Sequence, residues 1–128
     1  MILDSSAVLA ILLEETGFEV LLAKADSAAQ LAIGAPTLLE TKIVLARKLA
    51  ADASVRLVDF LESGQVRITP FTSDHLHAAF QAFEKFGKGR HPAKLNFGDC
   101  MSYAVARVSA QPLLYTGDDF AKTDIETA

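Results

Sequence analysis

The chain has 128 residues, of which 51% are apolar, and a formal net charge of −4. This length suits one domain, expected over residues 1–128, that buries roughly two-thirds of its unfolded surface and folds without disulfides. Cys100 is the one cysteine, and no Cys or His pair has zinc-ligand spacing, which favours a reducing cytoplasm. The longest apolar run, 7–13, follows no basic stretch, so we expect neither a signal peptide nor a membrane span.

Strand-like and helix-like segments alternate along the first half of the chain. In chain order, the pattern predicts a strand over 1–3, helices over 7–13 and 17–28, a strand over 31–35, and helices over 36–51 and 52–63. Pro36 is well suited to the first turn of its helix, and Leu49 is one of the apolar positions that carry that helix to about Ala51. Gly64 ends the next helix.

The second half continues the alternation with a strand over 66–70, a helix from Thr72 or Ser73 to about Phe86, a helix over 97–108 and a strand over 113–115. Leu76, Ala79, Phe80 and Phe83 recur at helical spacing, which predicts that they are core residues. Parallel strands joined by helices predict an α/β fold, a three-layer α/β/α sandwich with a central, mainly parallel sheet.

Four carboxylates, Asp4, Glu40, Asp99 and Asp118, stand at element boundaries of this pattern. Two follow strands and two lie near helix starts, and in a parallel sheet both kinds of position fall on the same edge. Gathered acids repel one another, and a divalent cation is the usual reason that a fold tolerates them. Hard oxygen ligands without Cys or His select Mg²⁺, or Mn²⁺, over zinc.

The first two acids also have structural interpretations. Asp4 could be a residue at a strand end near a helix start, although Ser5 and Ser6 are available for capping. Glu40 lies near the first turn of its helix, where the helix dipole favours an acid, although apolar residues occupy the positions three and four further on.

The other two acids have similar alternatives. Asn96 can cap a helix, and Asp99 follows it by three residues, as in a capping box. Asp118 and Asp119 lie in a glycine-containing turn, where aspartate is common. Asp119 could replace Asp118, share its role, or cap the next short helix.

Residues 85–94 carry four of the twelve basic residues and none of the sixteen acidic ones. This basic loop suits contact with a phosphate backbone, but a solvated loop or a surface for an acidic protein partner would have the same composition. His75, His77 and His91 are expected to be packing or surface residues, with no catalytic role.

Four segments, 1–7, 36–40, 95–100 and 114–125, resemble in order the motifs of PIN-domain ribonucleases of the VapC toxin type. The resemblance covers essentially the whole chain. It implies an endoribonuclease that is the toxin of a type II toxin-antitoxin pair and a homodimer. It also implies neutralisation by a small VapB-like antitoxin whose C-terminal segment lies across the active groove.

By this resemblance, Asp4 and Asp99 match the positions that hold Mg²⁺ most directly. Glu40 and Asp118 match acids that complete the catalytic site, with Asp118 also counted as a metal ligand. Thr116 matches a polar position that helps to orient the last turn. A metal-activated water would then attack the RNA phosphodiester in line and leave a 5′-phosphate and a 3′-hydroxyl, so no histidine pair is required.

Two other classes of protein compete with this interpretation. A receiver-like domain would need a second acid beside Asp4 and a phospho-acceptor after a mid-chain strand, and a haloacid-type phosphatase would need an aspartate where Ser6 stands. A noncatalytic module that uses the fold only to hold RNA or a partner also fits, although the set of four acids argues against it.

Overall fold

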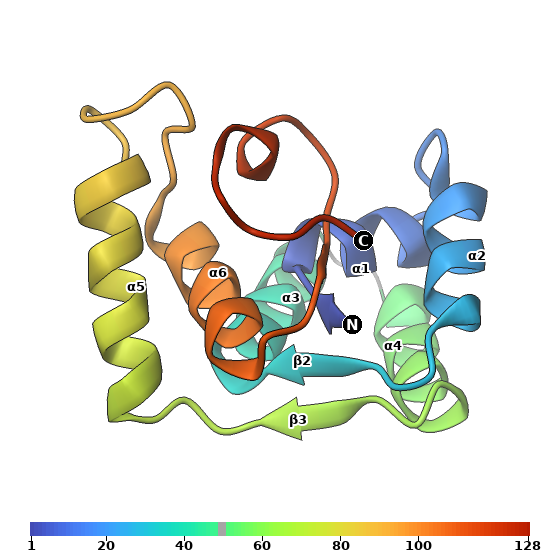
Figure 1. Cartoon of the computed structure of the whole chain (residues 1–128). Helices are drawn as coiled ribbons and strands as arrows, with labels where there is room; N and C mark the ends of the chain where they lie inside the picture. The colour runs from blue at the N-terminus through green and yellow to red at the C-terminus, as the bar shows by residue number, and fades with distance from the viewer. Residues whose placement is uncertain (49–50) are drawn as a thin grey trace.

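A computed structural model describes residues 1–48 and 51–128. Its centre is a sheet of four short strands in the order β3-β2-β1-β4, with every neighbouring pair parallel (Figure 1). The strands are β1 (Ile2–Leu3), β2 (Ala32–Gly34), β3 (Arg67–Thr69) and β4 (Leu113–Leu114). Ile2 pairs with Ala32 on one side and with Leu113 on the other, so β1 is central.

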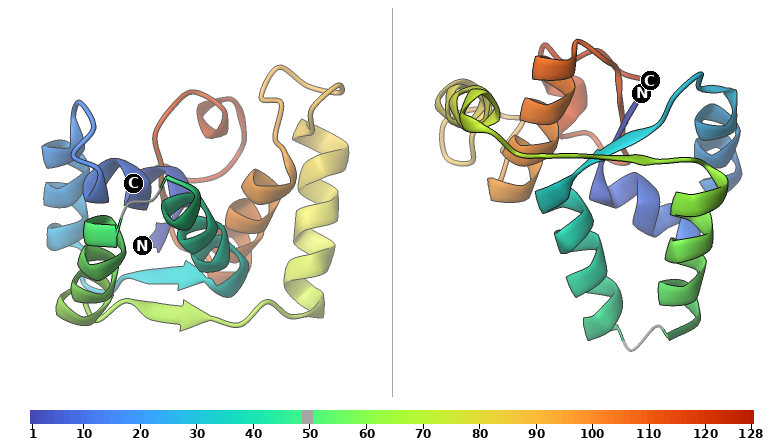
Figure 2. Two further views of the ribbon diagram at one scale, coloured as in Figure 1. Left: turned by 180° about the vertical axis from the view of Figure 1, so that it is seen from behind. Right: turned by 90° about the horizontal axis from the view of Figure 1, so that it is seen from below.

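Helices connect the strands and cover both faces of the sheet. They are α1 (Ser5–Leu12), α2 (Phe18–Ser27), α3 (Ala35–Arg47), α4 (Ala51–Ser63), α5 (Ser73–Phe86) and α6 (Phe97–Ser109), with a short 3₁₀ helix η1 (Phe120–Lys122). In Figure 1, α5 and α6 lie on one side of the molecule and α2 and α4 on the other, and Figure 2 shows the same separation from behind and below. None of these described helices is long and apolar enough to cross a membrane.

Two hydrophobic clusters follow from the alternation of side chains along the strands. Ile2 and Leu113 face the cluster beneath α5 and α6, whereas Leu3 and Leu114 face the cluster shared with α1 to α4. All four of these strand residues are at most 2% exposed. The predicted three-layer α/β/α sandwich with a parallel central sheet is therefore confirmed.

Some predicted helix boundaries differ from those in the structure. The helix predicted to reach Ala51 ends as α3 at Arg47, and Ala51 is instead the first residue of α4. Leu49, assigned to that helix from its sequence, lies outside the described residues. The first helix begins at Ser5 rather than at the expected residue 7, because Asp4 caps it.

The apolar stripe predicted as core on α5 is mostly exposed. Ala79 is buried, but Leu76, Phe80 and Phe83 are 61%, 59% and 37% exposed. The buried face of α5 is made by His75, Ala79, Ala82 and Phe86. The prediction was wrong because the apolar arc of α5 is wider than the surface that α6 and the sheet cover.

The C-terminal segment folds back onto α5 and α6. The Tyr103 hydroxyl donates a 2.6 Å hydrogen bond to one carboxylate oxygen of Asp124, and Lys85 Nζ lies 2.8 Å from the other. Arg107 is 4.0 Å from the same carboxylate. Burial opposes ionisation of Asp124, but these donors and cations dominate and lower its pKa.

We expect Asp124→Asn to lower the free energy of unfolding by about 1–2 kcal/mol at neutral pH, because it weakens a charged hydrogen-bond cluster. A lowered folded-state pKa gives stability that is present above the unfolded pKa and lost as pH falls through the folded value. The difference between wild type and variant, measured by urea unfolding, should therefore shrink below about pH 4.

Asp59→Asn, at an exposed position on α4, is the matched control. It should change the free energy of unfolding little, both at neutral pH and at acidic pH. Equal losses in the two variants would contradict the anchoring role of Asp124.

Candidate active site

The first acid, Asp4, leaves β1 and caps α1. Its Oδ2 accepts hydrogen bonds from the backbone N–H of Ser6, at 2.9 Å, and from the Ser6 hydroxyl. The residue is only 3% exposed. The capping role that the sequence allowed for Ser5 or Ser6 therefore belongs to Asp4 itself, and this cap fixes one oxygen of its carboxylate.

The Ser6 hydroxyl also connects Asp4 to the turn after β4. Its oxygen accepts a 3.1 Å hydrogen bond from the backbone N–H of Thr116. Thr116 thus takes part in the site through its backbone, whereas the resemblance drew attention to its side chain. Ser6 was not among the predicted site residues, although its place two positions after a strand-end acid is a readable signal.

Asp99 lies in the first turn of α6 and forms the capping box predicted with Asn96. Asp99 Oδ2 accepts from the Asn96 backbone N–H at 2.8 Å, and Asn96 Oδ1 accepts from the Asp99 backbone N–H at 2.9 Å. The two bonds satisfy donors that a helix start leaves without partners, and they fix the direction of the Asp99 carboxylate.

Glu40 reaches the same helix start from α3. Because α3 begins at Ala35, Glu40 is its sixth residue and no acid stands in its first turn, so the dipole of its own helix does not account for it. Its carboxylate instead lies against Gly98: a Cβ on Gly98 would be 2.7 Å from Glu40 Oε1 and 2.9 Å from Oε2. The absence of a side chain at Gly98 lets Glu40 approach α6. The sequence analysis missed this role of Gly98.

The turn after β4 carries two exposed aspartates. Gly117 adopts a left-handed conformation, with φ of +84°, and Asp119 precedes η1 without forming a side-chain capping bond to it. The predicted capping alternative for Asp119 is therefore absent from the described structure.

The negative charges of three other acids affect the pKa of Asp99. Burial is the main factor that raises the pKa of Asp99 to about 6, and the negative charges of Asp4, Asp119 and Glu40 add to it. The hydrogen bond from Asn96 acts in the opposite direction. The fold thus brings three acids from three other segments close enough to raise the pKa of Asp99. The acid of the last turn that contributes to this effect is Asp119. The role of Asp118 stays a prediction.

The two acids that accept backbone hydrogen bonds at helix starts, Asp4 and Asp99, have an oxygen chemistry that suits a hard cation. Asp4 and Asp99 each use Oδ2 for the local bonds described above, and within residues 1–48 and 51–128 neither Oδ1 accepts a hydrogen bond. One oxygen of each is thus oriented while the other is left for a ligand. No three Asp, Glu, His or Cys side chains of the described chain form a ready-made metal cage. Mg²⁺ is commonly held by one or two carboxylates and several waters.

The histidines lie apart from this chemistry. His75 is buried and its Nδ1 accepts from the Thr72 backbone N–H at 3.0 Å, whereas His77 is exposed. His91 accepts from the Ala93 backbone N–H and packs edge-on against Phe86. Their expected packing and surface roles are confirmed.

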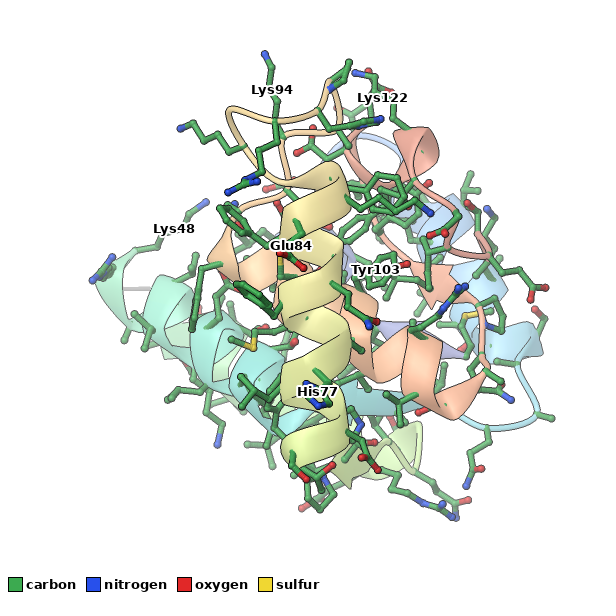
Figure 3. The ribbon with its side chains drawn as sticks, turned by 60° about the vertical axis from the view of Figure 1, so that its left-hand side comes forward. Lys48, His77, Glu84, Lys94, Tyr103 and Lys122 are labelled. Carbon is green, nitrogen blue, oxygen red and sulfur yellow. The ribbon has the colours of Figure 1, made fainter. Side chains whose placement is uncertain are left out.

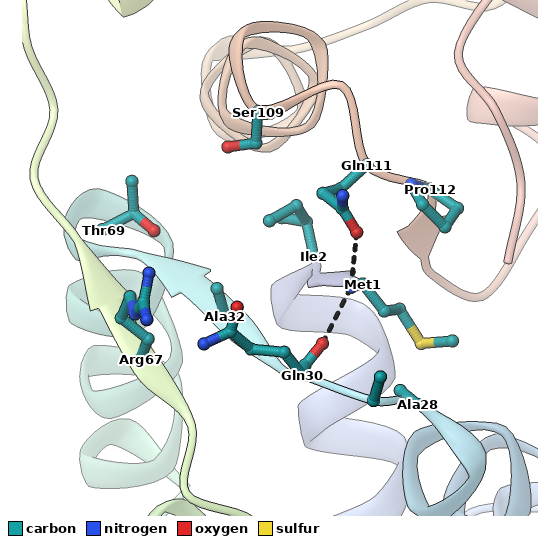
Figure 4. Close-up of a pocket in the computed structure, with 11 residues that line it drawn as sticks. Met1, Ile2, Ala28, Gln30, Ala32, Arg67, Thr69, Ser109, Gln111 and Pro112 are labelled. Carbon is teal, nitrogen blue, oxygen red and sulfur yellow. Dashed lines mark hydrogen bonds between the residues drawn. The ribbon is translucent and has the colours of Figure 1, made fainter.

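A hollow of about 600 Å³ lies at the opposite end of the sheet (Figure 4). Met1, Arg67 and Gln111 are among the residues that line it, and none of the four acids does. This hollow is therefore separate from the acidic site.

Comparison with known proteins identifies the family of this chain. A family model described as "PIN domain" matches residues 1–126. Ribonuclease VapC36 of Mycobacterium tuberculosis is 41% identical over 127 residues, which cover 98% of this chain and 91% of that protein. The chain therefore belongs to the PIN-domain family and, within it, to the VapC ribonucleases.

Solved structures of low sequence identity share the fold. The Mycobacterium tuberculosis toxin VapC20, described as cleaving the sarcin-ricin loop, superposes with a TM-score of 0.79 at 18% identity and covers 99% of this chain and 97% of its own. VapBC2 of Rickettsia felis, bound to a promoter DNA fragment, gives a TM-score of 0.77 at 13% identity, with 99% and 96% covered.

Without divalent cations, we expect Asp99→Asn to raise the free energy of unfolding above about pH 6. A raised folded-state pKa means that the folded protein keeps this proton to higher pH than the unfolded chain does, so wild-type stability should increase as pH falls from about 7 toward 4. An asparagine at this position can still accept the bond from Asn96.

Urea unfolding in EDTA, at about pH 5 and about pH 8, measures this effect. The gain in the free energy of unfolding of Asp99→Asn over wild type should be larger at the higher pH. The control Asp59→Asn should show no such dependence on pH. A variant no more stable than wild type at the higher pH would contradict the electrostatic account.

Proposed function

We propose that the protein is a Mg²⁺-dependent endoribonuclease and the toxin of a type II toxin-antitoxin pair. The observation that carries the proposal is the convergence of Asp4, Glu40 and Asp119 on Asp99, where burial raises the pKa of Asp99 and the three negative charges add to this effect. Nuclease names among the relatives support RNA as the substrate. Mn²⁺ offers the same oxygen-ligand chemistry and could replace Mg²⁺.

In this proposal, Asp4 and Asp99 hold the metal through the carboxylate oxygens that their caps leave without hydrogen bonds. Glu40 and an aspartate of the last turn complete the site, directly or through water; the electrostatic coupling favours Asp119, and Asp118 remains the alternative. The bound ion would supply a Lewis acid that activates water and offsets charge on the phosphate. Cleavage then leaves a 5′-phosphate and a 3′-hydroxyl.

We also propose a VapB-like antitoxin as the protein partner. The Rickettsia felis structure is a VapBC pair, and a cluster of acids suits a basic inhibitory segment. A homodimer, which the family resemblance implies, belongs to the same proposal. The mass of the purified protein in solution tests it.

The decisive experiment is cleavage of total RNA by the antitoxin-free protein, with Mg²⁺ or with EDTA. Asp4→Asn and Asp99→Asn should each lower the rate about 100-fold or more, because each removes a charge at the metal site. Asparagine is a good cap, so both variants should fold, and Asp59→Asn should cleave like wild type. The products should carry 5′-phosphate ends.

Cleavage that persists in EDTA, or in both site variants, would refute the metal-dependent mechanism. RNA binding without cleavage by wild-type protein would favour the noncatalytic module. Phosphotransfer from a small phosphodonor would favour the receiver-like or phosphatase class.

A further prediction separates the effect of a substitution on the cleavage rate from its effect on the free energy of unfolding. Gly98→Ala should keep or slightly raise the free energy of unfolding, since alanine favours a helix more than glycine and the clash falls on the mobile end of Glu40. The displaced carboxylate should lower the cleavage rate about 10-fold to 100-fold.

The matched control is the double variant with Glu40→Ala. Once the carboxylate is absent, Gly98→Ala should add no further loss of activity. Fully additive losses would contradict the proposed contact.

A further inference from the structure

The basic loop, residues 85–94, has a defined fold of its own. The backbone N–H groups of Arg90 and His91 both donate to the carbonyl oxygen of Gly87. Gly87 fits this turn because it lacks a side chain, since a Cβ there would clash with the carbonyl oxygen of Phe83. The loop therefore holds its cations at fixed places on the surface.

Buried residues fix the end of the loop. Ala93 and Leu95 are both 0% exposed and belong to the hydrophobic cluster beneath α5 and α6. The Leu95 backbone N–H donates to the carbonyl oxygen of Phe86, and the Leu95 carbonyl oxygen accepts from the backbone N–H of Lys88, both at 3.0 Å. Lys94 lies between the two buried residues and is itself exposed, so its side chain extends into solvent.

The backbone of Lys94 has an uncommon conformation. Its φ is +54°, in the left-handed region that glycine adopts without strain and residues with a side chain adopt at a cost. Such outliers, held in place by their surroundings, occur often at functional positions. A lysine at a position that suits glycine adds a charge that the turn itself does not need.

The lysines of the loop differ in their partners. Lys85 is paired with Asp124, at 2.8 Å. Over residues 1–48 and 51–128, the ammonium groups of Lys88 and Lys94 have neither a hydrogen-bond acceptor nor an ionic partner. In a chain with sixteen acidic residues, these two cations are thus available to an external anion.

The chain places Lys94 next to the acidic site. Lys94 precedes Asn96 by two residues, and the Asn96 backbone N–H donates a 2.8 Å hydrogen bond to the Asp99 carboxylate. Consecutive Cα atoms are about 3.8 Å apart, so the Cα atoms of Lys94 and Asn96 are at most about 8 Å apart. Figure 3 shows Lys94 above the carboxyl end of α5, with Lys122 of η1 at the same end of the molecule.

We propose that Lys94 and Lys88 bind backbone phosphates of single-stranded RNA beside the phosphodiester that is cleaved. The inference rests on the proposed nuclease function and adds the place where the flanking backbone is held. A lysine ammonium is a compact charge with three donors, and it binds a phosphate of any nucleotide. Contacts of this kind position the strand without reading its sequence.

An acidic protein segment would also complement two lysines. RNA is favoured by the place of Lys94 beside acids that suit a metal-bound phosphate. A strand whose phosphate lies at that metal carries another phosphate at the next nucleotide, within reach of the loop. A protein partner would have no such reason to bind the loop and the acids together.

Four variants test the inference. Lys94→Gly removes the ammonium and suits the left-handed backbone, so it should fold at least as stably as wild type. Lys94→Arg keeps the charge, and Lys88→Ala removes the second cation. Lys48→Ala is the matched control, because Lys48 is exposed at the end of α3 and lies away from Lys94 in Figure 3.

Fluorescence anisotropy with a labelled, mixed-sequence single-stranded RNA measures binding over a series of salt concentrations. Ca²⁺, which also takes oxygen ligands, replaces Mg²⁺ in this assay, and a gel shows that the RNA stays intact. Steady-state cleavage with Mg²⁺ then separates KM from kcat.

We expect Lys94→Gly and Lys88→Ala each to weaken binding and raise KM about threefold to tenfold, with kcat within about twofold of wild type. Each should also reduce the slope of log affinity against log salt by about 0.7, the value for one phosphate contact to a single strand. Lys94→Arg and Lys48→Ala should behave like wild type.

Wild-type affinity and salt slope in both Lys94→Gly and Lys88→Ala would overturn the inference, while wild-type cleavage leaves the nuclease proposal intact. An equal loss in Lys48→Ala would also overturn it, because the effect would then reflect net charge alone. Binding of a labelled poly-glutamate peptide that Lys94→Gly weakens, with RNA binding unchanged, would assign the loop to an acidic protein instead. If wild type fails to cleave, the nuclease proposal fails, and the salt slopes still decide whether the loop binds RNA.

Discussion

Parallel pairing of β1 with both β2 and β4 is the constraint on which the rest of the structure depends. β1 has only two residues, and each pairs on both sides while its side chain enters one of the two hydrophobic clusters. Because the three strands run in the same direction, the segments that follow them leave from one edge. Asp4, the start of α3 and the turn after β4 are gathered there by backbone pairing alone.

Local hydrogen bonds at helix starts hold the gathered acids in place. Asp4 caps α1, Asp99 shares a capping box with Asn96, and Glu40 approaches the first turn of α6 over Gly98. Backbone N–H groups at helix starts stabilise negative charge, so they partly offset the mutual repulsion of the acids. Burial raises the pKa of Asp99 to about 6, and the neighbouring negative charges add to this effect. A site built in this way is oriented in advance and electrostatically suited to a cation.

The surface near the acids also carries exposed apolar side chains of α5 and α6. α5 buries a face rich in alanine against α6 and leaves Leu76 and Phe80 in solvent, while α6 begins with an exposed phenylalanine. Together these residues form apolar recesses beside the acids and the basic loop. Exposed apolar recesses of this kind commonly mark binding surfaces. The outer faces of the two helices therefore have the apolar character of a binding surface, whereas their inner faces form part of the core.

The sequence by itself determined the layered α/β fold, the capping box of Asn96 and Asp99, and the position of most helices, because these depend on local periodicity and on hydrogen bonds between near neighbours. It also pointed to Asp4, Glu40, Asp99 and Asp118 as the acids of the site. Only the tertiary structure decided the link from Ser6 to Thr116, the contact of Glu40 with Gly98 and the coupling of Asp119 to Asp99. Those features join residues far apart in the chain, and the exposure of the apolar face of α5 likewise depends on which neighbour covers it.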